Sequence, residues 1–187
     1  MNNIDINNPK GHFTCKLIVT LAILVIVMIV ALPIETYAQK RGELGIALGE
    51  QPELVEIEDL DGNPLKLADY IGKKPLLIEF YAIWCDNCTT LLPQMTDVYD
   101  RYQEQIEFLA ISVAVSQSPK SIKKTLEKHP VDFATVWDEG GRAVRAFLVP
   151  ATSYIVVLDK QGIVTYTGIG PKQNIEEAVL TALGKTD

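Results

Sequence analysis

The sequence predicts an α/β protein in which helices flank a central mixed sheet. Two apolar runs, 75–82 and 106–115, have the length and composition of buried strands. An amphipathic segment separates them, and turn sequences at Asp61–Pro64 and Asp159–Gly162 indicate two β-hairpins. Because helices between strands must bury their apolar sides, we expect them to cover both faces of the sheet.

Length and composition are those of one globular domain with an N-terminal extension. The chain has 187 residues, and with 48% of them hydrophobic it can bury an ordinary core. The formal net charge is −7, and no cluster of Lys or Arg stands out. Nucleic acid is therefore not an expected partner, because binding it needs a basic surface.

Residues 1–38 are predicted to be a signal sequence or a membrane anchor. The uncharged apolar run 17–32 follows Lys10 and Lys16, so the N-terminus should stay in the cytoplasm while the rest crosses the membrane. The run, about 16 residues long, lies between a signal-peptide core and a full span. Residues 36–38 would allow cleavage, so export after cleavage and a retained single-pass anchor are both open.

The exported part divides into a linker, 39–51, and a folded domain, 52–187. Glycines scattered through the linker would let a tethered domain stand away from the bilayer. The domain is expected on the extracytoplasmic (periplasmic) side. A disulfide persists in such a compartment, and a dithiol that acts as a reductant must be kept reduced by an electron supply.

The domain is expected to begin with a β-hairpin. Residues 53–59 alternate apolar and acidic side chains, as a half-exposed strand does, and 65–67 can return after the turn at 61–64. A single helical turn at 68–72 leads to strand 75–82, whose side chains are nearly all apolar, as in a strand buried on both faces.

The middle of the chain is predicted to form a helix, a strand and a second helix. Residues 89–105 carry apolar side chains three and four apart, and Pro93 should kink this helix. The buried strand 106–115 precedes a lysine-rich helix at 119–128, whose lysines we interpret as a solvated face. His129 closes this helix, and a structural role as a cation at a helix C-terminus is preferred to a catalytic one.

The C-terminal part supplies the remaining strands and the closing helix. Its expected elements are a short strand at 133–137, a short helix at 142–147, a hairpin of strands 153–158 and 163–167, and an amphipathic helix at 174–183.

The stretch Trp84–Cys88, WCDNC, lies between a predicted strand and a predicted helix. Two thiols separated by two residues suit reversible disulfide chemistry. Unpaired N–H groups and the helix dipole at the helix N-terminus favour the thiolate of Cys85, and Cys88 lies within reach to close the disulfide.

A zinc site is the alternative use of this cysteine spacing. It would need two more ligands, and the only other Cys and His residues are Cys15, His12 and His129. Since the first two precede the apolar run, a redox pair is predicted, with no metal and no other cofactor.

Glu79 interrupts the apolar strand that precedes the dithiol. Burying a carboxylate costs several kcal/mol unless it is partnered or protonated. The residue could be exposed or paired with a lysine, but a buried acid beside the dithiol is the preferred interpretation.

Several features in register make the domain resemble the thioredoxin fold, and specifically TlpA-type thiol–disulfide oxidoreductases. They are the motif Trp84–Cys88, the strand acid Glu79, Pro93 in the following helix, and Pro150 where the family carries a cis-proline. The resemblance covers about residues 52–184. It implies a thioredoxin-like fold with an added N-terminal β-hairpin and an inserted strand and helix at 133–147.

The resemblance also implies a dithiol mechanism. An exposed Cys85 would attack a partner's disulfide, and a more buried Cys88 would resolve the mixed disulfide after losing its proton to Glu79. Pro150, if cis, would leave the preceding carbonyl and N–H free to pair with an extended substrate segment. Trp84 would either shape the docking surface beside the dithiol or belong to the core.

Asp86 bears on the direction of electron flow. The dipeptide between the cysteines lacks the proline common in this family, so the family's redox potential is not carried over. A carboxylate beside Cys85 opposes its thiolate, by about 1 kcal/mol at ~4 Å in a largely aqueous setting. Because about 1.4 kcal/mol corresponds to about 30 mV, Asp86 favours a reductant.

The predicted function is a membrane-tethered, monomeric disulfide reductase of exported proteins, for example in cytochrome c maturation, supplied by a membrane thiol electron donor. An oxidase or isomerase on the same fold would differ in redox potential. A peroxiredoxin-like peroxidase would need a threonine at Ala82. A copper-type metal chaperone would need a wider cysteine spacing and a late histidine.

Overall fold

The computed structural model describes residues 44–185. The predicted signal or anchor and residues 39–43 of the predicted linker lie outside these residues. Among the helices of residues 44–185, none has the length and hydropathy needed to cross a membrane.

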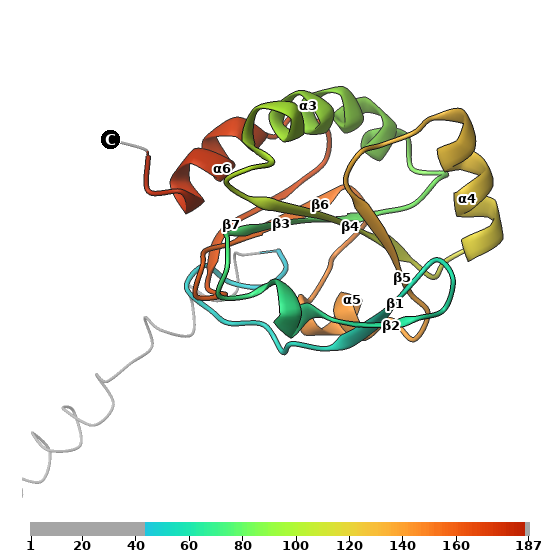
Figure 1. The fold of residues 1–187 in the computed structure, drawn as a ribbon, viewed down its shortest axis with the longest axis horizontal. Helices are drawn as coiled ribbons and strands as arrows, with labels where there is room; N and C mark the ends of the chain where they lie inside the picture. Colours follow the sequence, from blue (N-terminus) through green and yellow to red (C-terminus); the bar gives the residue numbers. More distant parts are fainter. Residues whose placement is uncertain (1–43, 186–187) are drawn as a thin grey trace, which may run out of the picture. The chain divides into compact units, whose positions relative to one another are not determined.

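Seven strands form one mixed sheet in the order β2-β1-β5-β4-β3-β6-β7 (Figure 1). The central strands β3, β4 and β5 are parallel, and every other neighbouring pair is antiparallel. The mixed sheet is therefore confirmed. Its strands are β1 (Glu56–Asp59), β2 (Pro64–Lys66), β3 (Leu76–Tyr81), β4 (Glu107–Val113), β5 (Ala134–Asp138), β6 (Tyr154–Leu158) and β7 (Val164–Ile169).

Helices lie on both sides of the sheet, as the sequence predicted. Figure 1 shows α3 and α6 on one side and α5 on the other, with α4 beyond the β4–β5 end. The helices are the 3-10 turn η1 (Leu67–Tyr70), α3 (Asp86–Tyr102), α4 (Pro119–Lys128), α5 (Arg142–Ala146) and α6 (Ile175–Ala182).

The N-terminal hairpin is joined to the sheet through the inserted strand. β1 and β2 pair as the predicted hairpin, and β1 also pairs with β5, where Glu58 lies opposite Trp137. The inserted β5 and α5 thus carry the hairpin at the edge of the sheet, and both predicted additions to the thioredoxin-like core are confirmed.

Helix α3 begins at Asp86, three positions before the predicted start. Cys85 is its N-cap, with extended backbone angles, and its sulfur accepts a hydrogen bond from the backbone N–H of Cys88. A sulfur is not among the usual capping groups, so the sequence pattern placed the start later. Pro93 lies inside the helix, as expected.

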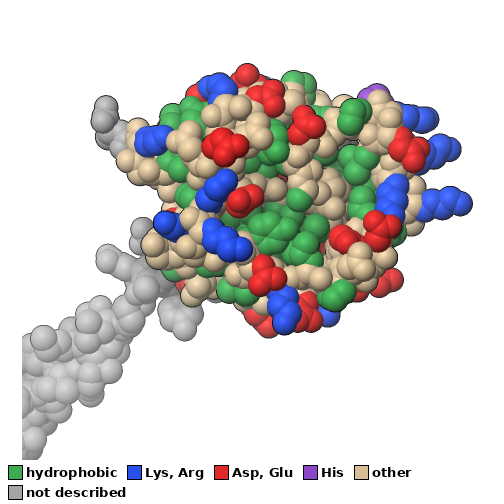
Figure 2. Space-filling view, in the orientation of Figure 1, with side chains coloured by type: hydrophobic (Ala, Val, Ile, Leu, Met, Phe, Trp, Pro, Cys, Tyr) green, Lys and Arg blue, Asp and Glu red, His purple; other side chains and the backbone are tan. Residues whose placement is uncertain are grey.

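Helix α4 has the start and the exposed face that its sequence predicted. Ser118 caps it in a capping box with Ser121. Its lysines project into solvent, as Figure 2 shows at the right of the molecule, and Lys123 contacts Asp61. The interpretation of these lysines as a solvated face is confirmed.

Strand β3 is buried on both faces, and the alternation of its side chains decides to which side of the sheet Glu79 points. Leu76, Ile78 and Phe80 belong to one apolar cluster, together with Phe147 and Tyr154. Leu77 belongs to the opposite cluster, beneath α3 and α6. Because side chains alternate along a strand, Glu79 points to the same side as Leu77.

Residues 44–51, which the sequence analysis assigned to the linker, pack against the domain. Ile46 is buried, and its N–H donates to the carbonyl of Phe147 at 3.1 Å. Gly49 donates to the carbonyl of Val164 at 2.8 Å. Gly45 has a φ of +91°, and a Cβ there would overlap the Tyr154 hydroxyl, so this segment requires glycine. The folded part therefore begins before the predicted boundary at residue 52.

Phe147 connects this segment to the core, and we expect Phe147→Ala to lower the free energy of unfolding by about 3–5 kcal/mol. Its ring is fully buried and lies 5.4 Å from the ring of Phe80. The neighbouring Leu148 is 63% exposed, so Leu148→Ala should change stability by less than about 0.5 kcal/mol. Urea unfolding measures both values. Equal losses in the two variants would contradict this description of the core.

Candidate active site

Cys85 and Cys88 form a disulfide at the N-terminus of α3. Their Cα atoms are 5.3 Å apart, within the usual range for a disulfide. The N–H of Cys88 lies 3.1 Å from the sulfur of Cys85. The predicted position of the first cysteine at the helix N-terminus is confirmed. The same N–H group can stabilise a Cys85 thiolate when the disulfide is open.

The expected difference in exposure between the two cysteines is wrong for this oxidised form. Cys85 is 6% exposed and Cys88 is 7% exposed. Both belong to the apolar cluster that contains Phe80 and Ala82. The disulfide and the cap turn the sulfur of Cys85 toward the first turn of the helix, which removes it from solvent.

Trp84 lies at the surface beside the dithiol. Its side chain is 49% exposed, and its ring N–H donates to the carbonyl of Val115 at 2.8 Å. The core interpretation of Trp84 is therefore wrong. Val115 is itself 56% exposed, so the two residues form an apolar surface next to the dithiol.

Gln117 holds the loop before the cysteines, a role that the sequence analysis missed. Its Oε1 accepts the N–H of Ile83 at 2.9 Å. Its Nε2 donates to Ser112 Oγ at 2.9 Å and to the carbonyl of Val113 at 2.5 Å. The bond to Ile83 joins residues 34 positions apart, so no local sequence signal could have identified it.

Glu79 is the buried acid that the sequence predicted. Its side chain is 4% exposed, and its Oε1 has no hydrogen-bond partner among residues 44–185. In the sheet it lies between Ala110 of β4 and Ile155 of β6. Burial raises the pKa of Glu79 to about 7, so the carboxyl can change charge near neutral pH.

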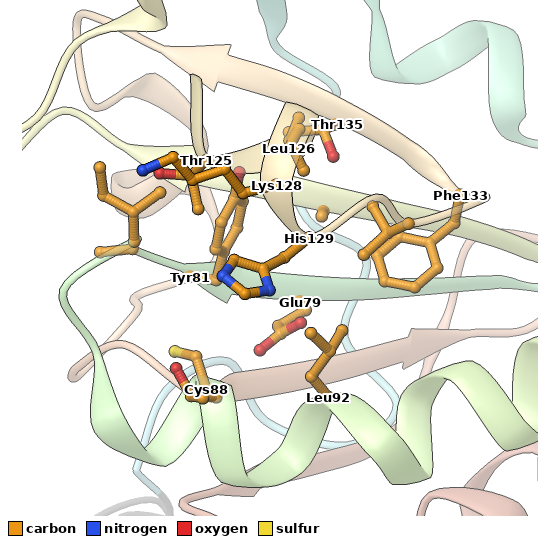
Figure 3. A pocket seen from close by; sticks show the side chains of 15 residues that line it. Glu79, Tyr81, Cys88, Leu92, Thr125, Leu126, Lys128, His129, Phe133 and Thr135 are labelled. Atoms are coloured by element: carbon orange, nitrogen blue, oxygen red, sulfur yellow. The ribbon is translucent and has the colours of Figure 1, made fainter. Parts of the chain in front are cut away.

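A cavity of about 460 Å³ brings Glu79 and Cys88 together (Figure 3). Its floor comes from the sheet, one wall from α3, and its rim from the end of α4. In Figure 3 the Glu79 carboxylate points toward α3, on the side of Cys88 and Leu92. Burial also raises the pKa of Tyr81, which lines the cavity, to about 12, so this phenol stays neutral at physiological pH.

His129 has the predicted position at the end of α4 and also lines this cavity. Its backbone N–H donates to the carbonyl of Thr125 at 2.9 Å, which confirms that it closes the helix. The sequence did not predict that His129 lies beside the dithiol cavity, because strand β4 and helix α4 separate it from Cys88 along the chain.

The cis peptide expected at Pro150 is absent, since all peptide bonds of residues 44–185 are trans. Pro150 is exposed in the loop between α5 and β6. The preceding N–H, which a cis-proline site was expected to leave free, donates from Val149 to the carbonyl of Val144 at 2.9 Å. This corrects the expected pairing of that N–H group with substrate, because it already bonds a carbonyl of the short helix α5.

Comparisons with known proteins agree with this geometry. A model of the AhpC/TSA family matches residues 48–167. Thiol-disulfide oxidoreductase ResA of Geobacillus kaustophilus is 31% identical over 135 residues, which cover 70% of this chain and 75% of that protein. ResA of Geobacillus thermodenitrificans is 29% identical over 160 residues, or 83% and 90% of the two chains.

A solved structure of similar fold is that of a putative thiol:disulfide interchange protein DsbE from Chlorobium tepidum. It has a TM-score of 0.65 and 23% identity, and the match covers 74% of this chain and 99% of that one. This likeness supports the thioredoxin-like architecture.

The burial of Glu79 predicts a pH-dependent stability difference between the oxidised wild type and Glu79→Gln. The pKa is about 7 in the folded protein against an ordinary 4.5, so the folded state holds more protons between these pH values. Wild-type stability should therefore fall, relative to the variant, by about 3 kcal/mol between pH 4 and pH 8.

Urea unfolding of both proteins at several pH values measures this difference, because contributions from other carboxyls cancel. Parallel pH profiles would show that Glu79 is not buried as a titrating acid.

Proposed function

Since the chain belongs to the AhpC/TSA family and is a thiol–disulfide oxidoreductase of the ResA type with the pair Cys85 and Cys88, we propose that it reduces disulfide bonds in exported proteins. The family itself implies substrates that contain disulfides. The observation that carries the proposal is the buried carboxyl of Glu79, unpartnered at Oε1, in the same cavity as Cys88.

The first step of the reaction is attack by Cys85 on a partner's disulfide. The thiolate is stabilised at the N-terminus of α3, where the Cys88 N–H already points at its sulfur. A bond forms between Cys85 and one partner sulfur, and the other partner sulfur leaves as a thiolate that takes a proton from solvent. The exposed ring of Trp84 contributes to the surface on which the partner docks.

The second step is resolution by Cys88, and it explains the need for a buried acid. A reductase must remove the proton from its inner thiol before that sulfur can attack. Glu79 takes this proton, and its pKa of about 7 suits the transfer at neutral pH. The Cys88 thiolate attacks Cys85, forms the internal disulfide and releases the second partner sulfur.

An extracytoplasmic location for the reaction is part of the proposal, and the N-terminal part of the sequence supports it. The apolar run 17–32 exports the domain or tethers it as a single-pass anchor, with the domain on the far side of the membrane. The dithiol there needs electrons from a membrane thiol donor, because no cytosolic thiol pool reaches it. Apocytochromes awaiting haem attachment are one class of exported protein that requires reduced thiols. The domain acts as a monomer.

The reduction potential of the Cys85–Cys88 pair tests the proposed direction. We expect about −270 mV or lower when the purified chain is equilibrated in glutathione or dithiothreitol buffers. The Cys88→Ser variant, which cannot form the internal disulfide, supplies the baseline. A potential near −120 mV would identify a disulfide donor and contradict the reductase proposal.

Asp86 is expected to contribute to this direction by opposing the Cys85 thiolate. It lies in the first turn of α3, next to Cys85, and is exposed. Asp86→Ala should lower the pKa of Cys85, since a nearby negative charge is removed. Thiolate absorbance, followed against pH in the reduced protein, measures this change. Asn87→Ala, which removes no charge, is the matched control, and a pKa that stays or rises in Asp86→Ala would refute the idea.

A further inference from the structure

We propose that His129 is the group through which the buried Glu79 exchanges its proton with solvent during the resolving step. The inference rests on the function proposed above, because that step delivers the proton of Cys88 to Glu79. His129 then acts in the catalytic cycle, a role that the sequence analysis ranked below a structural one at the end of the helix.

The three groups share one cavity although they come from three elements. Glu79 lies on β3, Cys88 in the first turn of α3, and His129 at the C-terminus of α4, and all line the same space of about 460 Å³ (Figure 3). That volume is many times the roughly 30 Å³ that one water occupies in the liquid. Thr125 and Thr135 also line it.

Burial hinders direct exchange of this proton with bulk solvent, because Glu79 is only 4% exposed. Its Oε1 has no protein partner among residues 44–185. Each turnover gives the carboxyl one proton, and this proton must leave before the next turnover. A route through the cavity to an exposed group meets this requirement.

Few ionisable groups of the described domain face this cavity. Besides Glu79 and Cys88 they are Tyr81 on β3 and Lys128 and His129 at the rim, while the lining residues of β4 and β5 are not ionisable. Burial raises the pKa of Tyr81, so its phenol keeps its proton, and a lysine ammonium offers donors but no acceptor. The imidazole of His129 has one nitrogen that can accept a proton and one that can donate, which suits a relay beside a buried acid.

The imidazole of His129 is also available for this role. The residue is exposed, and its backbone N–H bonds the carbonyl of Thr125, a contact that a substitution of the side chain would retain. Removing the ring should therefore leave the fold intact.

The proposed step is balanced in protons and electrons. Cys88 gives its thiol proton to the Glu79 carboxylate, and the resulting thiolate attacks Cys85 in the mixed disulfide. The sulfur–sulfur bond to the partner breaks, the internal disulfide forms, and the partner thiolate takes a proton from solvent. Neutral Glu79 then passes its proton through cavity water to a neutral His129, which releases it to bulk solvent.

The experiment uses the full, reduced chain with Cys15→Ser, so that Cys85 and Cys88 are its two thiols. The disulfide probe is 5,5′-dithiobis(2-nitrobenzoate), mixed in stopped flow at low buffer concentration together with a pH indicator. Attack by Cys85 releases one coloured thiolate, and resolution by Cys88 releases the second, so the two steps give separate phases. The relay acts after the internal disulfide has formed, so its readout is the arrival of the proton in bulk solvent, which the indicator reports. We expect His129→Ala to leave both thiolate phases unchanged and to delay the proton release that follows the second phase about tenfold at neutral pH.

Rescue and a control at the same rim distinguish proton transfer from a structural effect. Added imidazole, at constant pH and ionic strength, should restore prompt proton release in His129→Ala. Lys128→Ala should keep the proton release of the wild type. In the Glu79→Gln background, His129→Ala should have no further effect, because there is no carboxyl proton to relay.

The outcomes separate this inference from the proposed function. Proton release that is as prompt in His129→Ala as in the wild type, or a delay in that variant that imidazole does not remove, overturns the relay and leaves the dithiol mechanism standing. Absence of a second phase in the wild type overturns both.

Discussion

The contact on which the site depends is the hydrogen bond from the Cys88 N–H to the sulfur of Cys85. It satisfies one of the N–H groups that the first turn of a helix leaves unpaired. The helix consequently starts at the dithiol, with Cys85 as its cap, and the two cysteines are one turn apart. A single interaction thus ends the loop, begins α3 and directs the positive end of the helix dipole at the reactive sulfur.

The rest of the sheet holds this helix end in place. The loop before Cys85 is tied to the β4–α4 connection by Gln117, which accepts from Ile83, and by the ring N–H of Trp84. Both bonds join the segments that follow β3 and β4. These two strands are parallel neighbours, so their carboxyl ends lie side by side. The dithiol is therefore supported by the strand order, and the apolar ring of Trp84 remains available at the surface.

Glu79 makes the core less stable than an apolar side chain at the same position would. A leucine at this position of β3 would pack beside Ala110 and Ile155 without an unpartnered oxygen. The carboxyl is instead buried, and desolvation raises its pKa to about 7. The folded state therefore loses stability as the pH rises through this range. Such a cost is characteristic of a residue retained for proton transfer. The adjoining cavity connects Glu79, on the sheet, with the rim residues at the end of α4.

The sequence by itself determined the order of strands and helices, the redox pair and the buried acid. These follow from local patterns: apolar runs, turn residues, two cysteines at a strand–helix junction and one carboxyl in an apolar strand. Only the tertiary structure decided the start of α3, the packing of residues 44–51 on Phe147 and Val164, the surface position of Trp84 and the trans peptide at Pro150. It also brought Gln117 and His129 to the site. Each of these depends on contacts between distant segments, and such contacts leave no periodic signal in the chain because strand order, and not sequence spacing, sets which residues meet.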